Sequence, residues 1–487
     1  MHMHSIRITI RSNVPFASFR CIWLLFVLAL CFVHKGAVEA VQHPNLNTTQ
    51  ILALEILYNN TGGNSGTWDY TGIAGCVDTA LVGIGMKWNF TKDASTGVYS
   101  HDPCAHNATF TGLNCTCTAT TCDIITLALP CGKLVGTLPA ELTSLTMLGT
   151  VDFSSNENLR THPSLLDGIP SAIVFGELLY LEYLDLSSTI MSGNLSTLLL
   201  TSAPHASAHN SSLAHLNLES TAISGTIPAD FCSDHTSLQY LNLQNTYVGG
   251  SLPAEIGLLK QLATLNVAQC QFTDSIPPSL YTMTNLTSLD LSSNALTGGD
   301  NGISQIGSLF KLQHLSLASN NINDTIPSTI GNLASLTFMS LYSCNIVGKI
   351  SEELGNNVLL EHLDLSSNHL TSTLPTKLGN LVQLKKMFLY QNSLMGGIPK
   401  ELGALVKLEE LALYENYLTS TIPKELCINL TLLQWLDLAE NQLVGSIGIL
   451  MPFVHKRRRW GWCHGGLTTS KHAPKGTQTP PSSCLRS

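Results

Sequence analysis

The sequence predicts an α/β repeat solenoid, a coil of similar units stacked along one axis. Four consecutive segments of 24 residues between Leu312 and Lys407 begin with the same phrase, namely LQHLSLASNNI, LTFMSLYSCNI, LEHLDLSSNHL and LKKMFLYQNSL. Apolar residues fall at places one, four, six and eleven, and places four and six alternate as in a strand with one buried face. One such unit cannot bury its apolar side alone, so the units must stack.

The ninth place of the phrase holds a short polar side chain where the chain turns away from the strand. Asn is the usual residue there, and Thr221, Thr246, Cys270 and Cys344 replace it in single units. All of these side chains can form a hydrogen bond with nearby backbone, so we expect the two cysteines to be structural rather than nucleophilic. Cys232 and Cys427 occupy equivalent places in two distant units, which predicts free thiols.

The segments TIPSTIGNLASLTFMSL, TLPTKLGNLVQLKKMFL and GIPKELGALVKLEELAL closely match the plant-type leucine-rich repeat consensus, LxxLxLxxNxLxGxIPxxLGxL. The resemblance covers residues 124–447, about 12–13 repeats. It implies a right-handed curved leucine-rich repeat coil with a parallel β-sheet on its concave side and a short second strand near Gly-x-Ile-Pro. Extracellular members of this family are receptor ectodomains, receptor-like proteins and inhibitors of cell-wall hydrolases.

Residues 1–40 are typical of a secretory signal peptide. Arg7, Arg11 and Arg20 precede the short apolar run CIWLLFVLALCFV, and small residues follow at Val38 and Ala40. So short a run favours cleavage after Ala40 over the alternative of an uncleaved anchor. The exported chain is expected to be an N-linked glycoprotein, with sequons at Asn47, Asn59, Asn89, Asn107, Asn194, Asn210, Asn285, Asn323 and Asn429, and a weaker one at Asn114 beside a cysteine.

Residues 41–123 lack the repeat and are expected to form an N-terminal cap of a helix and a Cys-rich loop. The stretch ILALEILYNNTGGNSGTW opens with helical apolar spacing and ends at a Gly pair that terminates the helix. It is similar to the cap of plant-type and protist leucine-rich repeat proteins, and HDPCAHNATFTGLNC resembles their Asp-Pro-Cys stretch. Disulfides of open connectivity are favoured over metal ligation for Cys76, Cys104, Cys115, Cys117, Cys122 and Cys131.

Two stretches depart from the regular array. A Ser/Ala/His-rich insert contains His205 and His209, but neither a carboxylate nor a cysteine accompanies them, so a metal role is disfavoured. After Ile447 the repeat stops, and residues 448–487 read as an irregular basic tail rich in Gly, Pro and Ser. Either the chain is a secreted protein with this tail, or the tail is not genuine coding sequence and the native product is a longer receptor with a membrane span.

Composition and motifs favour binding over catalysis. Only 12% of residues are charged and the net charge is −9, which argues against a nucleic-acid partner because that would require a basic surface. No phosphate loop, metal-protease motif or nucleophile elbow occurs, and no cofactor or metal is expected. Single aspartates recur at the fifth place as solvated strand residues, at Asp185, Asp290, Asp364 and Asp437.

Places three, five and seven of each unit are predicted to point out of the concave sheet, where they form columns along the coil. The C-terminal columns concentrate aromatic rings beside one charge pair, whereas Tyr183 and Tyr240 are isolated exceptions earlier in the chain. We therefore expect a protein, peptide or glycan ligand, with a possible co-receptor, at Phe338, Tyr342, Lys386, Phe388, Tyr390, Glu410, Tyr414 and Trp435. The alternative is that these rings only pack on one another.

The resemblance to this family implies two classes of function. The first is an extracellular receptor-like protein in signalling or defence. The alternative is a secreted inhibitor of cell-wall hydrolases, a structural wall protein or the truncated ectodomain of a receptor kinase. No membrane span is expected in this chain after signal cleavage.

Overall fold

The computed structural model describes residues 45–46, 48–61, 113–117, 121–160, 175–199, 211–299, 302–445 and 459–461. Several predictions fall outside them: the signal peptide, the pair His205 and His209, Cys76 and Cys104, and the sequons at Asn47, Asn89, Asn107 and Asn210. None of the helices within the described ranges is long and apolar enough to cross a membrane.

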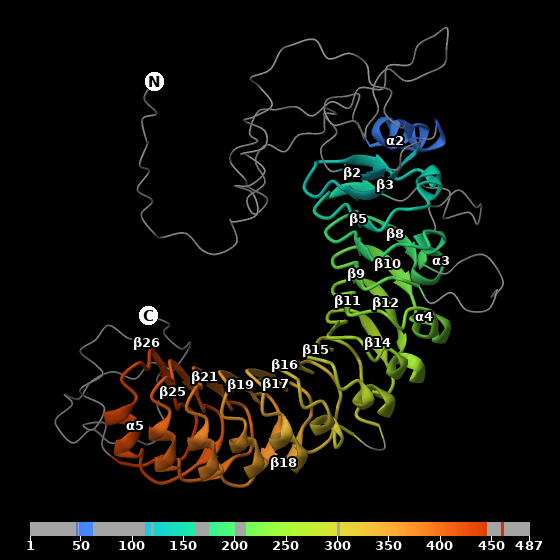
Figure 1. Ribbon diagram of the computed structural model, residues 1–487. Coiled ribbons are helices and arrows are strands. Elements are labelled where there is room, and N and C mark those ends of the chain that lie inside the picture. The colour runs from blue at the N-terminus through green and yellow to red at the C-terminus, as the bar shows by residue number, and fades with distance from the viewer. Residues whose placement is uncertain are drawn as a thin grey trace, which may run out of the picture.

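One long sheet lines the inner side of a curved coil (Figure 1). Its sixteen strands follow the chain order, and all but β2 (Leu113–Cys117) pair in parallel. Each repeat unit, called a rung below, contributes one strand. These strands are β3 (Thr121–Ala128), β5 (Thr150–Asp152), β7 (Tyr183–Asp185), β9 (His215–Asn217), β11 (Tyr240–Asn242), β13 (Thr264–Asn266), β15 (Ser288–Asp290), β16 (His314–Ser316), β17 (Phe338–Ser340), β19 (His362–Asp364), β21 (Lys386–Phe388), β23 (Glu410–Ala412) and β25 (Trp435–Asp437).

A second row of short strands follows each turn away from the inner sheet. Four of them join in the order β14-β12-β10-β8, and the others form pairs. Their bounds are β4 (Val135–Thr137), β6 (Asn158–Arg160), β8 (Ser192–Asn194), β10 (Ala222–Gly225), β12 (Tyr247–Ser251), β14 (Gln271–Thr273), β18 (Val347–Lys349), β20 (His369–Thr371), β22 (Met395–Gly396) and β24 (Tyr417–Leu418).

Short helices, mostly of the 3-10 type, cover the outer side of the coil. Several begin directly after a proline with extended backbone, as Pro327 does before η9, because proline fixes φ and needs no N–H partner. They are η3 (Ala140–Ser144), η5 (Phe175–Glu177), α3 (Leu195–Leu199), α4 (Ala229–Asp234), η6 (Ala254–Leu258), η7 (Pro278–Thr282), η8 (Ile306–Ser308), η9 (Ser328–Asn332), η10 (Glu352–Asn356), η11 (Thr376–Asn380), η12 (Lys400–Ala404) and α5 (Lys424–Asn429).

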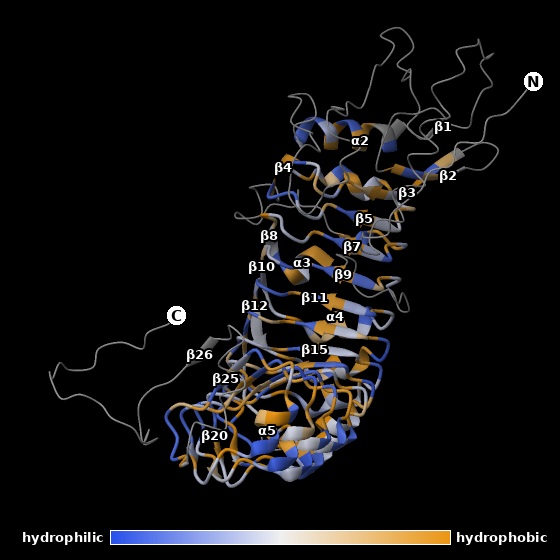
Figure 2. Ribbon diagram, turned by 90° about the vertical axis from the view of Figure 1, so that its left-hand side faces the viewer, coloured by the Kyte–Doolittle hydropathy of each residue, from blue (hydrophilic) through white to orange (hydrophobic). Residues whose placement is uncertain are grey.

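The core is a continuous stack of leucine and isoleucine side chains between these layers. In the rung of β16, Leu312, Leu315, Leu317 and Ile322 are at most 2% exposed, and they occupy the four predicted apolar places. In Figure 2 hydrophobic segments recur in every turn of the coil. The fold class and the leucine pattern are therefore confirmed.

The ninth-place side chains hold adjacent rungs together. Asn320 donates to the carbonyls of Leu291 and Leu317, at 2.9 Å each, and its Oδ1 accepts the N–H of Leu296 at 2.9 Å. The Cys344 thiol donates to the Leu317 carbonyl at 3.0 Å. Burial raises the pKa of this thiol to about 12. The structural interpretation of the ninth-place cysteines is confirmed, and Cys232 and Cys427 are free as predicted.

The two ends of the array differ from its middle. At the N-terminus, the predicted helix is present as α2 (Thr48–Asn60), which follows β1 (Asn45–Leu46) and buries Leu54 and Leu57 over the first rung. The backbone N–H of Val135 donates to the Thr61 carbonyl at 3.1 Å. Cys115, Cys122 and Cys131 are in disulfides. At the C-terminus, the basic segment expected to be irregular contributes one further strand, β26 (Arg459–Gly461), parallel to β25.

Candidate functional site

The predicted third-place column exists on the inner sheet. Parallel pairing places Phe338 beside His362, His362 beside Lys386, Lys386 beside Glu410 and Glu410 beside Trp435. Because equivalent residues pair without a shift, five consecutive rungs present their side chains in one line. The inner sheet thus brings together residues almost a hundred positions apart in the chain.

The eight predicted ligand-binding residues are called the C-terminal patch: Phe338, Tyr342, Lys386, Phe388, Tyr390, Glu410, Tyr414 and Trp435. Tyr390 and Tyr414 stack with ring centroids 4.5 Å apart. Phe388 contacts Trp435 at 6.0 Å and Tyr390 at 6.5 Å. These rings form one connected surface across β21, β23 and β25.

The aromatic surface extends beyond the predicted residues through two histidines. Phe338 stacks between His314, at 4.3 Å, and His362, at 4.6 Å. His362 then meets the edge of Phe388 at 5.5 Å. The third-place column read from the sequence includes His362, but neither His314 nor His362 is among the predicted ligand-binding residues, although their third-place positions and planar rings were a sufficient signal.

The rings of the C-terminal patch differ in how much surface they offer. Tyr342 is 36% exposed, whereas Phe338, Phe388, Tyr390, Tyr414 and Trp435 are half-buried. The rings stack on one another, as expected if they only pack together, and such contacts stabilise neighbouring strands. The partly exposed faces also leave rigid aromatic area open to a partner.

One ion pair lies within the C-terminal patch. Lys386 Nζ is 2.8 Å from Glu410 Oε1, and the two side chains are 42% and 27% exposed. Burial lowers the pKa of His362 and raises the pKa of Tyr414 and of Asp437. At neutral pH these shifts favour the uncharged forms of the His362 and Tyr414 rings.

A second aromatic cluster lies in the N-terminal half of the inner sheet, and it corrects an expectation. Tyr183 and Tyr240 are not isolated, because His215 is stacked between them with centroid distances of 4.2 Å on both sides. The Tyr183 hydroxyl donates to Asp185 at 3.5 Å, and burial raises the pKa of Tyr183 to about 12. This trio of rings is called the N-terminal stack.

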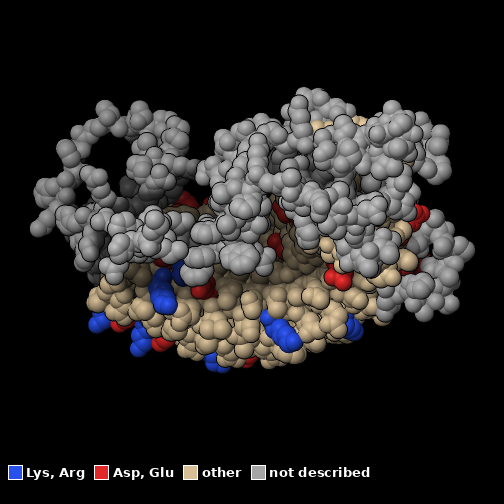
Figure 3. Space-filling view, turned by 45° about the horizontal axis from the view of Figure 1, so that its top comes forward, with Lys and Arg blue, Asp and Glu red and all other residues tan. Residues whose placement is uncertain are grey.

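The charges on the strands of the inner sheet are mainly acidic, because Asp152, Asp185, Asp290, Asp364 and Asp437 end five of those strands. In Figure 3 the Lys and Arg side chains lie mainly along the outer rim, and acidic side chains are visible within the hollowed inner face. Within the part of the chain that the structure describes, no group of three His, Cys, Asp or Glu residues is arranged to hold a metal ion.

Comparison with known proteins supports the repeat assignment. A family model of a leucine-rich repeat region matches residues 206–325, and a model of a single leucine-rich repeat matches residues 359–381. No curated protein matches the chain.

Solved structures share the architecture. A plant peptide hormone receptor, RGFR1, determined in complex with RGF2, is 28% identical with a TM-score of 0.56, over 69% of this chain and 54% of that one. A TDR receptor is 27% identical with a TM-score of 0.52, over 64% of this chain and 54% of that one. This chain therefore spans about half the length of either receptor structure.

Proposed function

We propose that this chain, which is a leucine-rich repeat protein with plant-type repeats, is an extracellular receptor-like recognition module. Its ligand is a peptide or an extended segment of a protein, bound across the C-terminal patch. The observation that carries the proposal is the connected, partly exposed aromatic surface around Lys386 and Glu410.

The chemistry of the patch suits a peptide. Tyrosine and tryptophan provide rigid area with a polar edge, and such residues dominate the energy of many interfaces. Lys386 and Glu410 can each meet an opposite charge on the ligand, which would select its orientation. No catalytic role is proposed.

The dimensions of the patch also suit an extended peptide. Five adjacent strands spaced by about 4.8 Å span about 19 Å. An extended chain rises by about 3.3 Å per residue, so about six residues would cross the patch. Alternate side chains of such a segment are about 6.6 Å apart, so about three of them would face the five rungs.

The described glycosylation sequons leave the repeat strands of the inner sheet clear. Asn59 lies in α2, Asn194 in β8 and Asn429 at the end of α5, while Asn285 and Asn323 lie in connections outside the strands. Asn114, on β2, lies at the N-terminal end. Glycans attached outside the repeat strands would increase solubility without covering the patch.

The likeness to a peptide hormone receptor supports the same proposal. The proposal includes an extracellular or cell-surface location and a co-receptor as a second partner.

Selection from a library of random linear peptides on the immobilised protein tests the proposal. We expect enriched peptides to bind the protein in calorimetry and to lose affinity when Tyr390, Tyr414 and Trp435 are all replaced by alanine. Hot-spot residues of this kind contribute roughly 2 kcal/mol or more each, so binding should become undetectable.

Two further variants separate binding from folding. Tyr183→Ala combined with Tyr240→Ala removes two stacked tyrosines from the same sheet but outside the patch, and should preserve affinity. Tyr342→Ala removes an exposed ring with little effect on stability and should weaken binding. Failure to enrich any peptide, or equal affinity in the triple variant, would contradict the proposal.

A further inference from the structure

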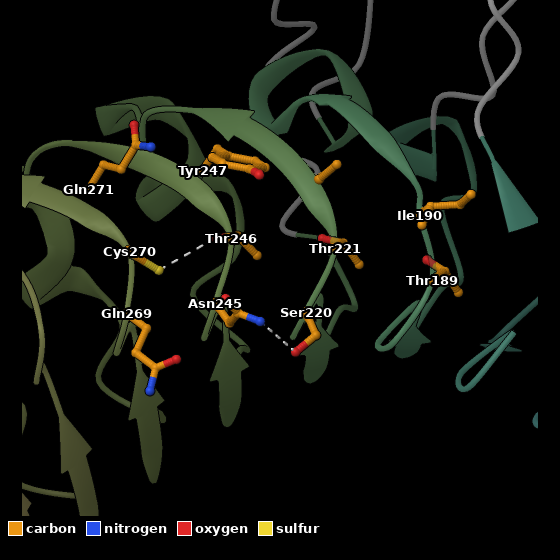
Figure 4. A pocket seen from close by; sticks show the side chains of 11 residues that line it. Thr189, Ile190, Ser220, Thr221, Asn245, Thr246, Tyr247, Gln269, Cys270 and Gln271 are labelled. Atoms are coloured by element: carbon orange, nitrogen blue, oxygen red, sulfur yellow. Dashed lines mark hydrogen bonds between the residues drawn. The ribbon is translucent and has the colours of Figure 1, made fainter. Parts of the chain in front are cut away.

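A hollow of about 380 Å³ lies at one rim of the coil, away from the C-terminal patch. It is formed where the chain turns from the inner strands β7, β9, β11 and β13 toward the four-stranded sheet β14-β12-β10-β8. Figure 4 shows its side chains in three rows, which are the eighth, ninth and tenth places of successive rungs. Its volume falls within the range of roughly 300–1,000 Å³ that is usual for small-molecule sites.

The hollow coincides with the four consecutive rungs that lack the ninth-place asparagine. Thr189, Thr221 and Thr246 each donate to a carbonyl of their own rung, at 2.7–2.8 Å, and the Thr246 hydroxyl also lies 3.4 Å from the Cys270 thiol. Asparagine resumes in the next rung, where Asn294 donates to the Val267 carbonyl of the preceding rung at 2.8 Å. The shorter threonine side chains, which are 2–5% exposed and donate to backbone carbonyls, therefore form a shallow floor under the tenth-place residues.

The lining is polar but carries no ionised side chain. Burial raises the pKa of the Cys270 thiol, and the other polar groups are hydroxyls and amides. An anionic or cationic ligand would find no opposite charge there, and a purely apolar ligand would leave the amides without hydrogen-bond partners. The lining thus selects a neutral ligand rich in hydroxyl groups.

Two features indicate a sugar ring in particular. Tyr247 is 59% exposed at the tenth place, so its ring offers a flat apolar face beside the polar floor. Gln269 and Gln271 stand on either side of Cys270 on the neighbouring rung, and both are exposed. An amide side chain both donates and accepts, which matches adjacent hydroxyls of a saccharide.

The Asn245 amide is already oriented by its rung neighbour. Its Nδ2 donates to Ser220 Oγ at 3.1 Å, which turns the carbonyl oxygen toward other donors. We infer that this hollow, here called the rim hollow, binds a short neutral oligosaccharide, with Tyr247 packed against a sugar ring and the Gln269, Gln271 and Asn245 amides bonding its hydroxyls.

Saturation-transfer NMR and calorimetry on the full chain test this inference. The probes are cellotriose, laminaritriose, maltotriose, chitotriose and the N-glycan core pentasaccharide, with trigalacturonate as the anionic comparison. We expect at least one neutral probe to bind and trigalacturonate not to bind. The pentasaccharide distinguishes a glycoprotein glycan from a fragment of a neutral polysaccharide.

Matched variants locate the binding. Tyr247→Ala should weaken it at least tenfold, whereas Tyr417→Ala removes a tyrosine that is 55% exposed at the same tenth place of another rung and should leave it unchanged. Ala222→Arg, which fills the rim hollow without removing a packed ring, should abolish binding at an unchanged melting temperature.

The inference is overturned if no neutral probe binds at millimolar concentration, or if Tyr247→Ala and Ala222→Arg bind as well as the parent chain. It is also overturned if the triple variant of the C-terminal patch loses saccharide binding while the rim variants retain it. Because the two sites lie on different rungs, failure here leaves the proposed peptide function unaffected.

Discussion

At the scale of single residues, a buried asparagine stabilises the fold when its amide is fully hydrogen-bonded and destabilises it when a polar atom lacks a partner. Asn368 donates to the carbonyls of Leu341, Leu365 and Ser366 and accepts the N–H groups of Cys344 and Ile346, all within 3.0 Å. Asn357 is equally inaccessible, but only its Nδ2 has a partner, the Ile330 carbonyl at 3.1 Å. Its Oδ1 is buried without one.

Replacing Asn357 with leucine should therefore stabilise the protein. Corresponding positions in neighbouring rungs are Leu333, Leu381 and Leu405, and an unsatisfied buried acceptor costs about 1–3 kcal/mol. We expect the gain to be about 1 kcal/mol, because the Ile330 carbonyl loses its donor. Asn368→Leu is the control and should lose several times that amount. Denaturant unfolding measures both, and a loss of stability in Asn357→Leu would contradict this account.

His215 predicts a pH dependence of stability. Burial between two tyrosines lowers its pKa in the folded protein, against the opposite effect of Asp185. Below about pH 6.5 the unfolded chain therefore binds more protons than the folded protein. The contribution of neutral His215 to folding stability is present above that pH and is lost as the pH falls. His235 and His362 act in the same direction.

His215→Gln should flatten the decline of the unfolding free energy between pH 7 and pH 5. One proton accounts for at most about 1.4 kcal/mol per pH unit. His369→Gln removes an exposed histidine and should leave the slope unchanged. An unchanged slope in His215→Gln would show that the stacked imidazole does not resist protonation.

At the scale of elements, sequence periodicity was sufficient for the strands and the columns but not for every contact. The register of β17 to β25 follows from equal spacing of 24 or 25 residues. The N-terminal stack was missed because Tyr183 and His215 are 32 positions apart, which hides their pairing on adjacent strands. The rim hollow could not be predicted in the same way. Replacement of the ninth-place asparagine predicts that another side chain forms the hydrogen bond, but it does not predict the space that the shorter side chain leaves above itself.

The outer helices stack closely only because glycine recurs near their ends. A Cβ added to Gly355 in η10 would overlap the Lys377 carbonyl oxygen in the next helix. Gly355→Ala should therefore destabilise the protein by about 1–3 kcal/mol, the usual cost of overpacking. Gly397 is the matched control, since a Cβ there would meet its nearest neighbour at 3.6 Å.

Thermal or denaturant unfolding of the two alanine variants tests the helix contact. Gly397→Ala should remain within about 0.5 kcal/mol of the parent. Equal stability of both variants would mean that the helices separate at no cost, and that the backbone contact between η10 and η11 is not a constraint on the coil.

At the scale of the whole molecule, the coil is stabilised by contacts between neighbouring rungs, so its ends are the weakest points. The inner array is held by leucine stacks and ninth-place amides. Among the described residues of the cap, helix α2 covers the N-terminal end of the array through Ala53, Leu54, Leu57 and Tyr58. A hydrogen bond from Gln50 to Asp123 of 3.1 Å adds one polar contact with the first rung.

Such a small cap is expected to depend on its disulfides more than the array does. Crosslinks restrict the unfolded state of a chain segment, and Cys115 on β2, Cys122 on β3 and Cys131 just after β3 are in disulfides. By contrast, Cys232 and Cys344 are buried free thiols, so a reductant has nothing to cleave at those two positions.

Hydrogen exchange with and without a reductant tests this difference. Under native conditions, reduction should speed exchange in α2 and β2 while β15 to β21 remain protected, because local openings at the end of a repeat array need not propagate. A maleimide should then label the cap cysteines before Cys232 and Cys344. Uniform loss of protection along the chain would show that the cap and the array unfold as one cooperative unit. Unchanged exchange in α2 would show that its apolar contacts keep the helix folded without the disulfides.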